Sequence, residues 1–144
     1  MIEEDTIKLL RECDAGVAMG ISAIDQVMDV AKSQSLRDAL NRCRAEHQQL
    51  QDEVVTALHR FHDEGKEPNP IAQGMSWIKT GAMLTMKESD ATIADLITDG
   101  CNMGVKSLNR YLNQYEAASE DAKDITKRLI ALEEKLAEDI RRFL

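Results

Sequence analysis

Two glycine pairs with the same spacing constrain the fold of this chain more than any other feature. Gly16 and Gly20 lie four residues apart, as do Gly100 and Gly104, and each pair lies on the apolar face of a segment with helical periodicity. A glycine inside a helix costs about 0.5–1 kcal/mol relative to alanine, so two on one face indicate that a bulky group or another backbone lies close. The two pairs are separated by 84 residues, and the apolar residues around them recur at the same offset. We infer an internal repeat.

The composition argues against several classes of partner. The chain of 144 residues is long enough for one domain with its own core, and its formal net charge of −8 argues against nucleic acid and anionic membranes, because both need a basic surface. No apolar run approaches the ~20 residues of a transmembrane helix, and no signal peptide follows Met1. We therefore expect a cytoplasmic protein. Cys13, Cys43 and Cys101 form no Cys-x-x-Cys pair, which favours reduced thiols over disulfides or a zinc site.

Apolar residues at intervals of three and four predict helices along nearly the whole chain. The first helical hairpin covers residues 3–64, and its second helix begins at Ser35, which with Asp38 resembles a capping box. The second hairpin covers residues 90–144 and turns at Ser119, which we expect to cap the last helix. The apolar periodicity continues through this turn, so one long helix is the alternative. The repeat favours two helices, because it places a turn there.

The segment 65–89 separates the two hairpins and contains both prolines of the chain. Its apolar spacing predicts a shorter helix, which would cross from one end of the bundle to the other. Trp77, the only tryptophan, lies in this segment. We expect it to anchor the crossover helix on the bundle, and a contact with a partner protein is the alternative.

Two long hairpins joined by one long crossover are the connectivity of the ferritin-like bundles. The chain resembles this superfamily over nearly its whole length. In the general character of its sequence, it is similar to the small uncharacterised bacterial proteins placed there. The resemblance implies an all-α, up-down four-helix bundle in a single domain, residues 1–144. A ferritin-like di-iron site takes one Glu from each of two helices and a Glu-x-x-His pair from each of the others. This chain has no Glu-x-x-His, and its inward positions as assigned carry no carboxylate, so we expect no metal and no cofactor.

His47 is the most notable single residue, because it lies on the apolar face of its helix. Antiparallel pairing within the first hairpin places it opposite Gly20, whose missing side chain makes room for the imidazole. We interpret it as a buried neutral histidine bonded to a backbone carbonyl, to Asn102 or to a tyrosine hydroxyl. The alternative is that His47, with Cys43, Cys101 or Asp99, binds a metal ion or lines a small cavity. The second alternative metal site is a surface pair, His59 and His62, which the helix dipole explains more simply.

The glycine pairs permit two arrangements of the first helices of the two hairpins. Close packing of the helices is the favoured interpretation, because protein interiors rarely leave voids. The alternative is an apolar chamber lined by Met19, Met103 and their neighbours Ile24, Leu108 and His47. The charged run Glu133-Glu134-Lys135 is assigned to a solvated face, without a function.

Three classes of function follow from these patterns. The sequence shows no serine or cysteine spaced with a histidine and an acid in a way that indicates a nucleophilic site. We therefore expect a non-catalytic bundle that acts through self-association or a protein partner. The alternative is a degenerate ferritin-like protein that binds a metal or small ligand near His47. An enzyme is the third class, and it requires side chains distant in the sequence to converge.

Overall fold

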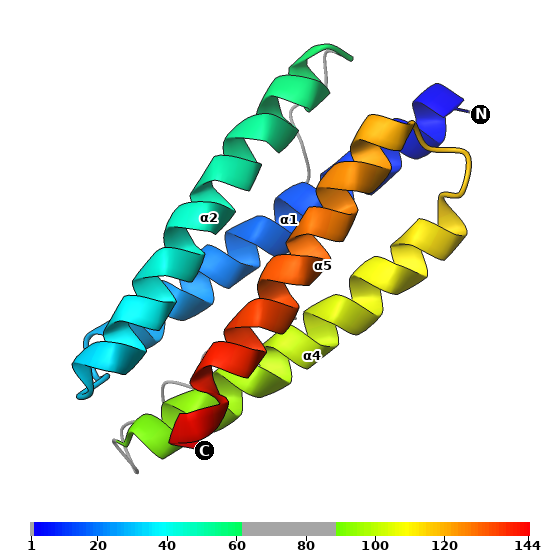
Figure 1. Ribbon diagram of the computed structural model, residues 1–144. Helices are drawn as coiled ribbons and strands as arrows, with labels where there is room; N and C mark the ends of the chain where they lie inside the picture. Colours follow the sequence, from blue (N-terminus) through cyan, green and yellow to red (C-terminus); the bar gives the residue numbers. More distant parts are fainter. Residues whose placement is uncertain (1, 62–88) are drawn as a thin grey trace.

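The computed structural model describes residues 2–61 and 89–144, and in these ranges the chain forms α-helices and no strand. The four helices are α1 (Ile2–Met28), α2 (Gln34–His59), α4 (Asp90–Gln114) and α5 (Glu120–Ile140), and a 3-10 turn, Arg141–Phe143, follows α5 (Figure 1). The prediction of an all-α fold is confirmed. The predicted crossover, including Trp77, lies outside the described residues apart from Ser89, and so does His62.

Serine side chains begin three of the four helices. Ser33, Ser89 and Ser119 each have an extended backbone, and each hydroxyl accepts a hydrogen bond from a backbone N–H in the first turn of its helix. The predicted cap at Ser119 is confirmed, and the predicted cap at Ser35 is wrong, because Ser33 caps α2 two residues earlier. The capping serines of α2 and α5 are therefore 86 residues apart, so the offset of 84 between the glycine pairs does not extend to the turns.

The last two helices are separate, as the repeat predicted. α4 ends at Gln114, and the backbone N–H of Tyr115, at its C-cap, donates to the carbonyl of Tyr111. Ser119 then caps α5, so the turn between the helices is short. The unbroken apolar periodicity suggested one long helix because residues in a tight turn, such as the buried Ala118, can also face the core.

Hydrogen bonds between the hairpins establish the directions of the helices. Asp90, at the start of α4, accepts bonds from the backbone N–H groups of Lys32 and Ser33 at 2.8 and 2.9 Å. At the other end of the bundle, Thr6 of α1 accepts a bond from the N–H of Ser119 at 2.8 Å. α2 and α4 therefore begin at one end, and α1 and α5 begin at the other. The end of α2 and the start of α4 thus lie at opposite ends of the bundle (Figure 1).

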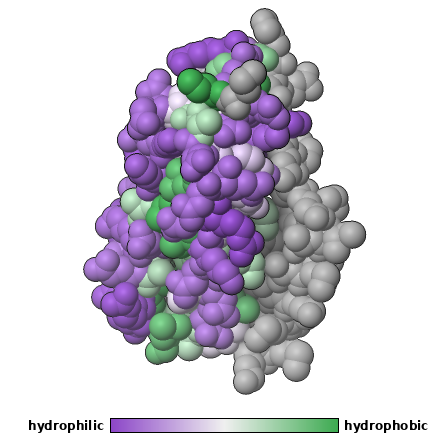
Figure 2. All heavy atoms as spheres, turned by 90° about the vertical axis from the view of Figure 1, so that its right-hand side faces the viewer, coloured by the Kyte–Doolittle hydropathy of each residue, from purple (hydrophilic) through white to green (hydrophobic). Residues whose placement is uncertain are grey.

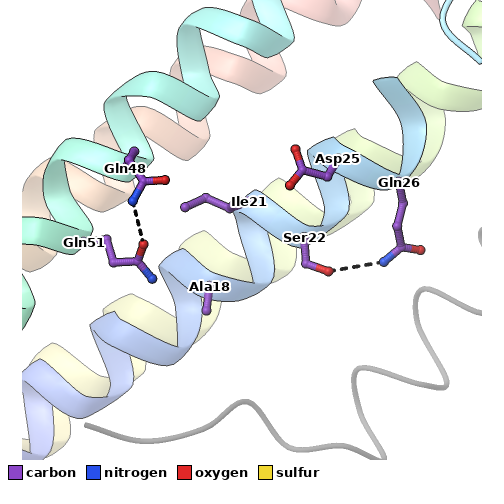
Figure 3. A pocket seen from close by; sticks show the side chains of 7 residues that line it. All are labelled: Ala18, Ile21, Ser22, Asp25, Gln26, Gln48 and Gln51. Atoms are coloured by element: carbon purple, nitrogen blue, oxygen red, sulfur yellow. Dashed lines mark hydrogen bonds between the residues drawn. The ribbon is translucent and has the colours of Figure 1, made fainter. Parts of the chain in front are cut away.

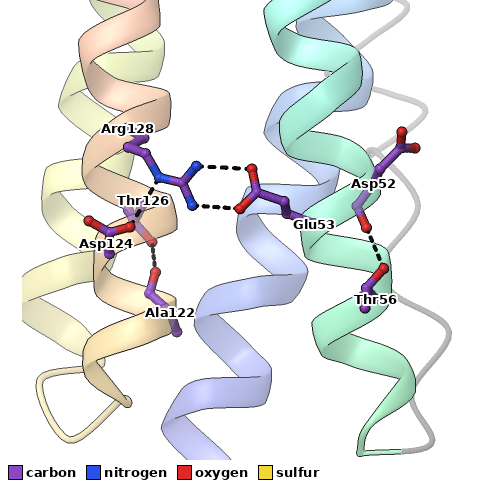
Figure 4. Close-up of polar contacts among 7 residues, drawn as sticks. All are labelled: Asp52, Glu53, Thr56, Ala122, Asp124, Thr126 and Arg128. Carbon is purple, nitrogen blue, oxygen red and sulfur yellow. Dashed lines mark hydrogen bonds and ion pairs between the residues drawn. The ribbon is translucent and has the colours of Figure 1, made fainter.

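Each helix packs against its partner in the hairpin and against the other hairpin. α1 packs along α2 and α4 along α5, while α2 and α1 both contact α5, and α1 also contacts α4. On the outside of the α2–α5 contact, the Arg128 guanidinium donates to both carboxylate oxygens of Glu53, at 2.8 and 2.9 Å (Figure 4). Arg128 also pairs with Asp124 one turn away on its own helix. These side chains are substantially exposed, so the pairs align the helices more than they stabilise them.

The apolar core is divided into two clusters. Each cluster takes buried residues from all four helices, and the two are separated by one interruption on each helix. The residues at these interruptions are Gly20 on α1, His47 on α2, Gly104 on α4 and Glu133 on α5. We call these four residues the middle layer. The ionisable groups of the core therefore lie near its centre, while the other buried polar side chains, Thr6 and Thr126, lie toward the end at which α1 and α5 begin.

Candidate functional site: the middle layer and its groove

His47 is completely buried in the middle layer and has a hydrogen-bond partner at each ring nitrogen. Nδ1 donates to the Cys43 carbonyl, one turn earlier in α2, at 2.8 Å, and Nε2 donates to Oε1 of Glu133 on α5, also at 2.8 Å. The predicted bond to a backbone carbonyl is present. The partner at the other nitrogen is a carboxylate, and not Asn102, which is exposed, or a tyrosine.

Gly20 makes room for this imidazole, as the register of the first hairpin predicted. A Cβ atom at Gly20 would lie 2.9 Å from both Cδ2 and Nε2 of His47, closer than real Cβ contacts allow. The histidine cannot move aside without breaking its hydrogen bonds. The absence of a side chain at Gly20 is therefore a requirement of the His47 position.

Glu133 is the functional candidate that sequence reasoning missed. Its side chain is 12% exposed, so its assignment to a solvated face is wrong, as is the expectation that no inward position carries a carboxylate. The signal was its spacing, four residues after the buried Leu129 and three before the buried Leu136. Leu132, which the predicted apolar face included instead, is only partly buried. The acid reaches the core because His47 offers a charged partner there.

The two bonds imply a charged histidine, and not the neutral one expected. A carbonyl can only accept a hydrogen bond, and so can an ionised carboxylate, so an imidazole between these two partners donates from both nitrogens and is an imidazolium. Burial lowers the pKa of His47, but its interactions with Cys43 and Glu133 outweigh that effect and raise the pKa to about 10. The middle layer therefore holds an ion pair at neutral pH.

Cysteine thiols flank this ion pair on both sides. The Cys43 sulfur lies 3.3 Å from Nδ1 of His47, and burial together with the Glu133 carboxylate strongly raises the pKa of Cys101. The structure thus brings His47 together with the two thiols that the sequence placed near it, and with a carboxylate, Glu133, that the sequence did not place there. The Nδ1 proton is, however, donated to the Cys43 carbonyl, and Cys43 is 6% exposed and does not line the groove described below. The arrangement is not that of an accessible, activated nucleophile.

A groove of about 320 Å³ opens between α1 and α4 at the level of the glycines. His47, Glu133 and Leu129 lie on its inner side, and both glycine pairs, Met19 and Met103 line it. Its lining is mainly apolar, with these residues: Glu12, Ala15, Gly16, Met19, Gly20, Ala23, Ile24, His47, Leu96, Ile97, Asp99, Gly100, Cys101, Met103, Gly104, Ser107, Leu108, Tyr111, Leu129, Glu133 and Leu136. The face of the molecule in Figure 2 is mostly hydrophilic, with small hydrophobic patches between the hydrophilic side chains.

This groove corresponds to the chamber interpretation of the glycine pairs, and not to the favoured close packing. The nearest described atoms to a Cβ placed at Gly16 or Gly104 belong to α5, Leu129 at 3.7 Å and Glu133 at 3.6 Å. At these two positions the described atoms nearest to the glycines therefore belong to α5, and not to the other glycine-bearing helix. Met103 is 61% exposed, so it lies at the rim.

A second hollow, of about 450 Å³, lies between α1 and α2; it is shallow, and five of its seven described lining residues are polar. Figure 3 shows its side chains, Ala18, Ile21, Ser22, Asp25, Gln26, Gln48 and Gln51. Its amides bond to neighbours on their own helices, Gln48 to Gln51 and Gln26 to Ser22. None of these groups is buried, and the hollow has no feature that would orient a ligand.

The part of the chain that the structure describes contains no group of three or more His, Cys, Asp or Glu side chains arranged to hold a metal ion. His59 is exposed at the end of α2, and its predicted partner lies outside the described ranges. Within the same ranges, no helix is both long and apolar enough to cross a bilayer. Large exposed apolar side chains described there are scattered over different elements: Ile2, Val55, Met103 and Leu144.

A comparison with protein-family models, with curated proteins and with solved structures finds no match for this chain.

Proposed function

We propose that this protein is a ferritin-like bundle that binds a small, largely apolar molecule in the groove between α1 and α4. Of the functions that the sequence leaves open, the small-ligand alternative has the better support from geometry. Self-association and protein binding stay predictions, since no continuous apolar face is exposed on the described helices.

The arrangement of the described helices supports the ferritin-like part of the proposal. The hydrogen bonds at the two ends are consistent with α1 and α5 parallel and with α2 and α4 parallel, which one long crossover requires. Equivalent positions also make equivalent contacts: Thr6 and Asp90, which are 84 residues apart, each accept a bond from the N–H of a capping serine of the other hairpin.

The observation that carries the binding proposal is the groove itself. Ligand sites are concave, mostly apolar and furnished with a few placed polar groups, and a hollow of about 320 Å³ with a buried ion pair at its inner side has these properties. Methionines such as Met19 and Met103 suit such a lining because their flexible side chains adapt to different shapes. Glycine at four lining positions keeps the groove open, at a cost in helix stability.

Xenon tests the groove without knowledge of the natural ligand. Crystals pressurised with xenon are expected to show the gas at the glycine level, because xenon occupies apolar cavities. Gly104→Leu places a side chain into the groove and is expected to abolish this binding. The matched control is Lys106→Leu, which adds the same side chain at an exposed position outside the groove. Native crystals with no xenon there, together with no response of the glycine amides to n-hexanol in solution, would end the proposal.

A further inference from the structure

The charges around the groove are of one sign apart from the buried histidine. Glu12, Asp99 and Glu133 line it, while the only basic group in the lining that the structure describes is His47, which is completely buried and bonded at both nitrogens. Among the described lining residues, no basic side chain is therefore available to an anionic ligand. Such a ligand would meet the exposed carboxylate of Asp99 and the carboxylate of Glu133, which is already paired with His47.

Glu133 has hydrogen-bonding capacity left on its groove side. A carboxylate has about four acceptor positions. His47 occupies one of these positions, on Oε1. The Cys101 thiol also forms a hydrogen bond to the Glu133 carboxylate. A thiol is a weak donor, so a stronger donor can replace it at the carboxylate. The other oxygen, Oε2, lies 3.6 Å from the position that a Cβ atom at Gly104 would occupy, and both residues line the groove.

From these features we propose that the ligand is a small amphiphilic cation, an ammonium group on an apolar chain or ring. The ammonium donates to Glu133 next to Gly104, and the apolar body lies along Met19 and Met103. This inference rests on the proposed function, because it assigns a chemical class to the molecule that the groove binds. The carboxylate is already in place and held by His47, so it needs no reorganisation when the cation arrives.

Three probes of equal chain length separate charge from apolar burial. We would titrate ¹⁵N-labelled protein at pH 7 with n-hexylammonium, n-hexanol and n-hexanoate and follow the amides of the groove glycines. Hexylammonium is expected to bind at least about tenfold more tightly than hexanol, since a hydrogen bond to a charged group is worth about 1.5–3 kcal/mol. Hexanoate is expected to bind most weakly of the three.

Glu133→Gln tests the residue that carries the selectivity. It removes the charge but keeps an oxygen that can accept from His47, so hexylammonium is expected to lose its advantage while hexanol binds as before. The matched control is Glu134→Gln, the same change at the exposed neighbouring position of α5, which should leave all three affinities unchanged. Unchanged hexanol binding in Glu133→Gln also shows that the groove is intact.

The outcomes distinguish the two proposals. If hexanol binds but hexanoate binds as tightly as hexylammonium, or if Glu133→Gln leaves the preference for the cation unaltered, the assignment of the ligand class is wrong and the binding groove stands. If none of the three probes perturbs the glycine amides, and xenon is also absent from the groove, both the ligand class and the proposed function are wrong.

Discussion

His47 and Glu133 lie at the same position in two different helices, each fourteen residues after the capping serine (33 to 47, and 119 to 133), and their side chains meet at 2.8 Å. The equivalent positions of the two hairpins therefore meet at the centre of the bundle as a base and an acid. Gly20 and Gly104 lie beside them, so each hairpin contributes one small and one ionisable residue to the middle layer.

The stability of the protein is expected to decrease as the pH rises above neutrality. The pKa of His47 is raised to about 10 in the folded protein, against 6.5 for a free histidine, so the folded state holds an extra proton between these values. The contribution of His47 is complete below pH 6.5 and is lost as the pH passes 10. Between pH 6.5 and 8, before thiols of the unfolded chain ionise, the free energy of unfolding should fall by roughly 1 kcal/mol per pH unit.

Urea denaturation at several pH values in this range measures the effect, with His47→Gln as the reference. The variant should show a flatter dependence on pH, because it lacks the extra proton. An NMR titration gives a direct check, since the His47 ring should still have the chemical shifts of an imidazolium at pH 8. A neutral ring at that pH would contradict the assignment of an ion pair.

Gly20→Ala and Gly104→Ala are expected to have opposite effects on stability. A methyl group at Gly20 would lie 2.9 Å from the His47 ring, and such overpacking costs about 1–3 kcal/mol. At Gly104 the nearest described atom is 3.6 Å away, an ordinary contact, so the variant should gain about 0.5–1 kcal/mol from the better helix propensity of alanine. Thermal or urea unfolding of both variants measures the two changes in stability. Equal changes in the same direction would show that the need for a glycine at position 20 does not come from His47.

Replacement of one member of the ion pair should be more harmful than replacement of both. Glu133→Leu leaves the Nε2 of a fully buried His47 without an acceptor, and the loss of one partner of a buried pair costs about 3 kcal/mol. In the double variant His47→Leu/Glu133→Leu an apolar layer replaces the pair, and most of this loss should be recovered. A double-mutant cycle from urea denaturation measures the coupling; losses that simply add would contradict it.

Asp90→Ala should loosen the contact between the first turn and α4. Asp90 accepts hydrogen bonds from the backbone N–H groups of Lys32 and Ser33, and its removal is expected to cost about 1–2 kcal/mol of unfolding free energy. Hydrogen exchange of those two amides should accelerate. Asp95→Ala, at an exposed position of the same helix, is the control and should leave both the exchange and the stability unchanged.

Local patterns in the sequence predicted the helices and the partner of Gly20. Apolar spacing of three and four residues, serine caps and the register of a tight hairpin act over short distances along the chain, so residues close in sequence determine them. The placement of His47 against Gly20 followed from that register, and the break at Ser119 was predicted from the repeat together with the capping serine. The cap of α2 was misplaced by two residues because Ser33 and Ser35 are both acceptable caps. The residue that contacts Ser33, Asp90, lies 57 residues further along the chain, so local patterns could not indicate it.

The sequence by itself determined that this chain is helical, that it turns at Ser119 and that His47 faces the core, because each depends on local periodicity, capping or hairpin register. Only the tertiary structure decided that Glu133 faces inward and that His47 is charged. The physical reason is that a buried charge is stable only beside its partner, and the partner of Glu133 lies 86 residues away on another helix. The groove likewise depends on the distance between α1 and α4, which their packing on α5 determines.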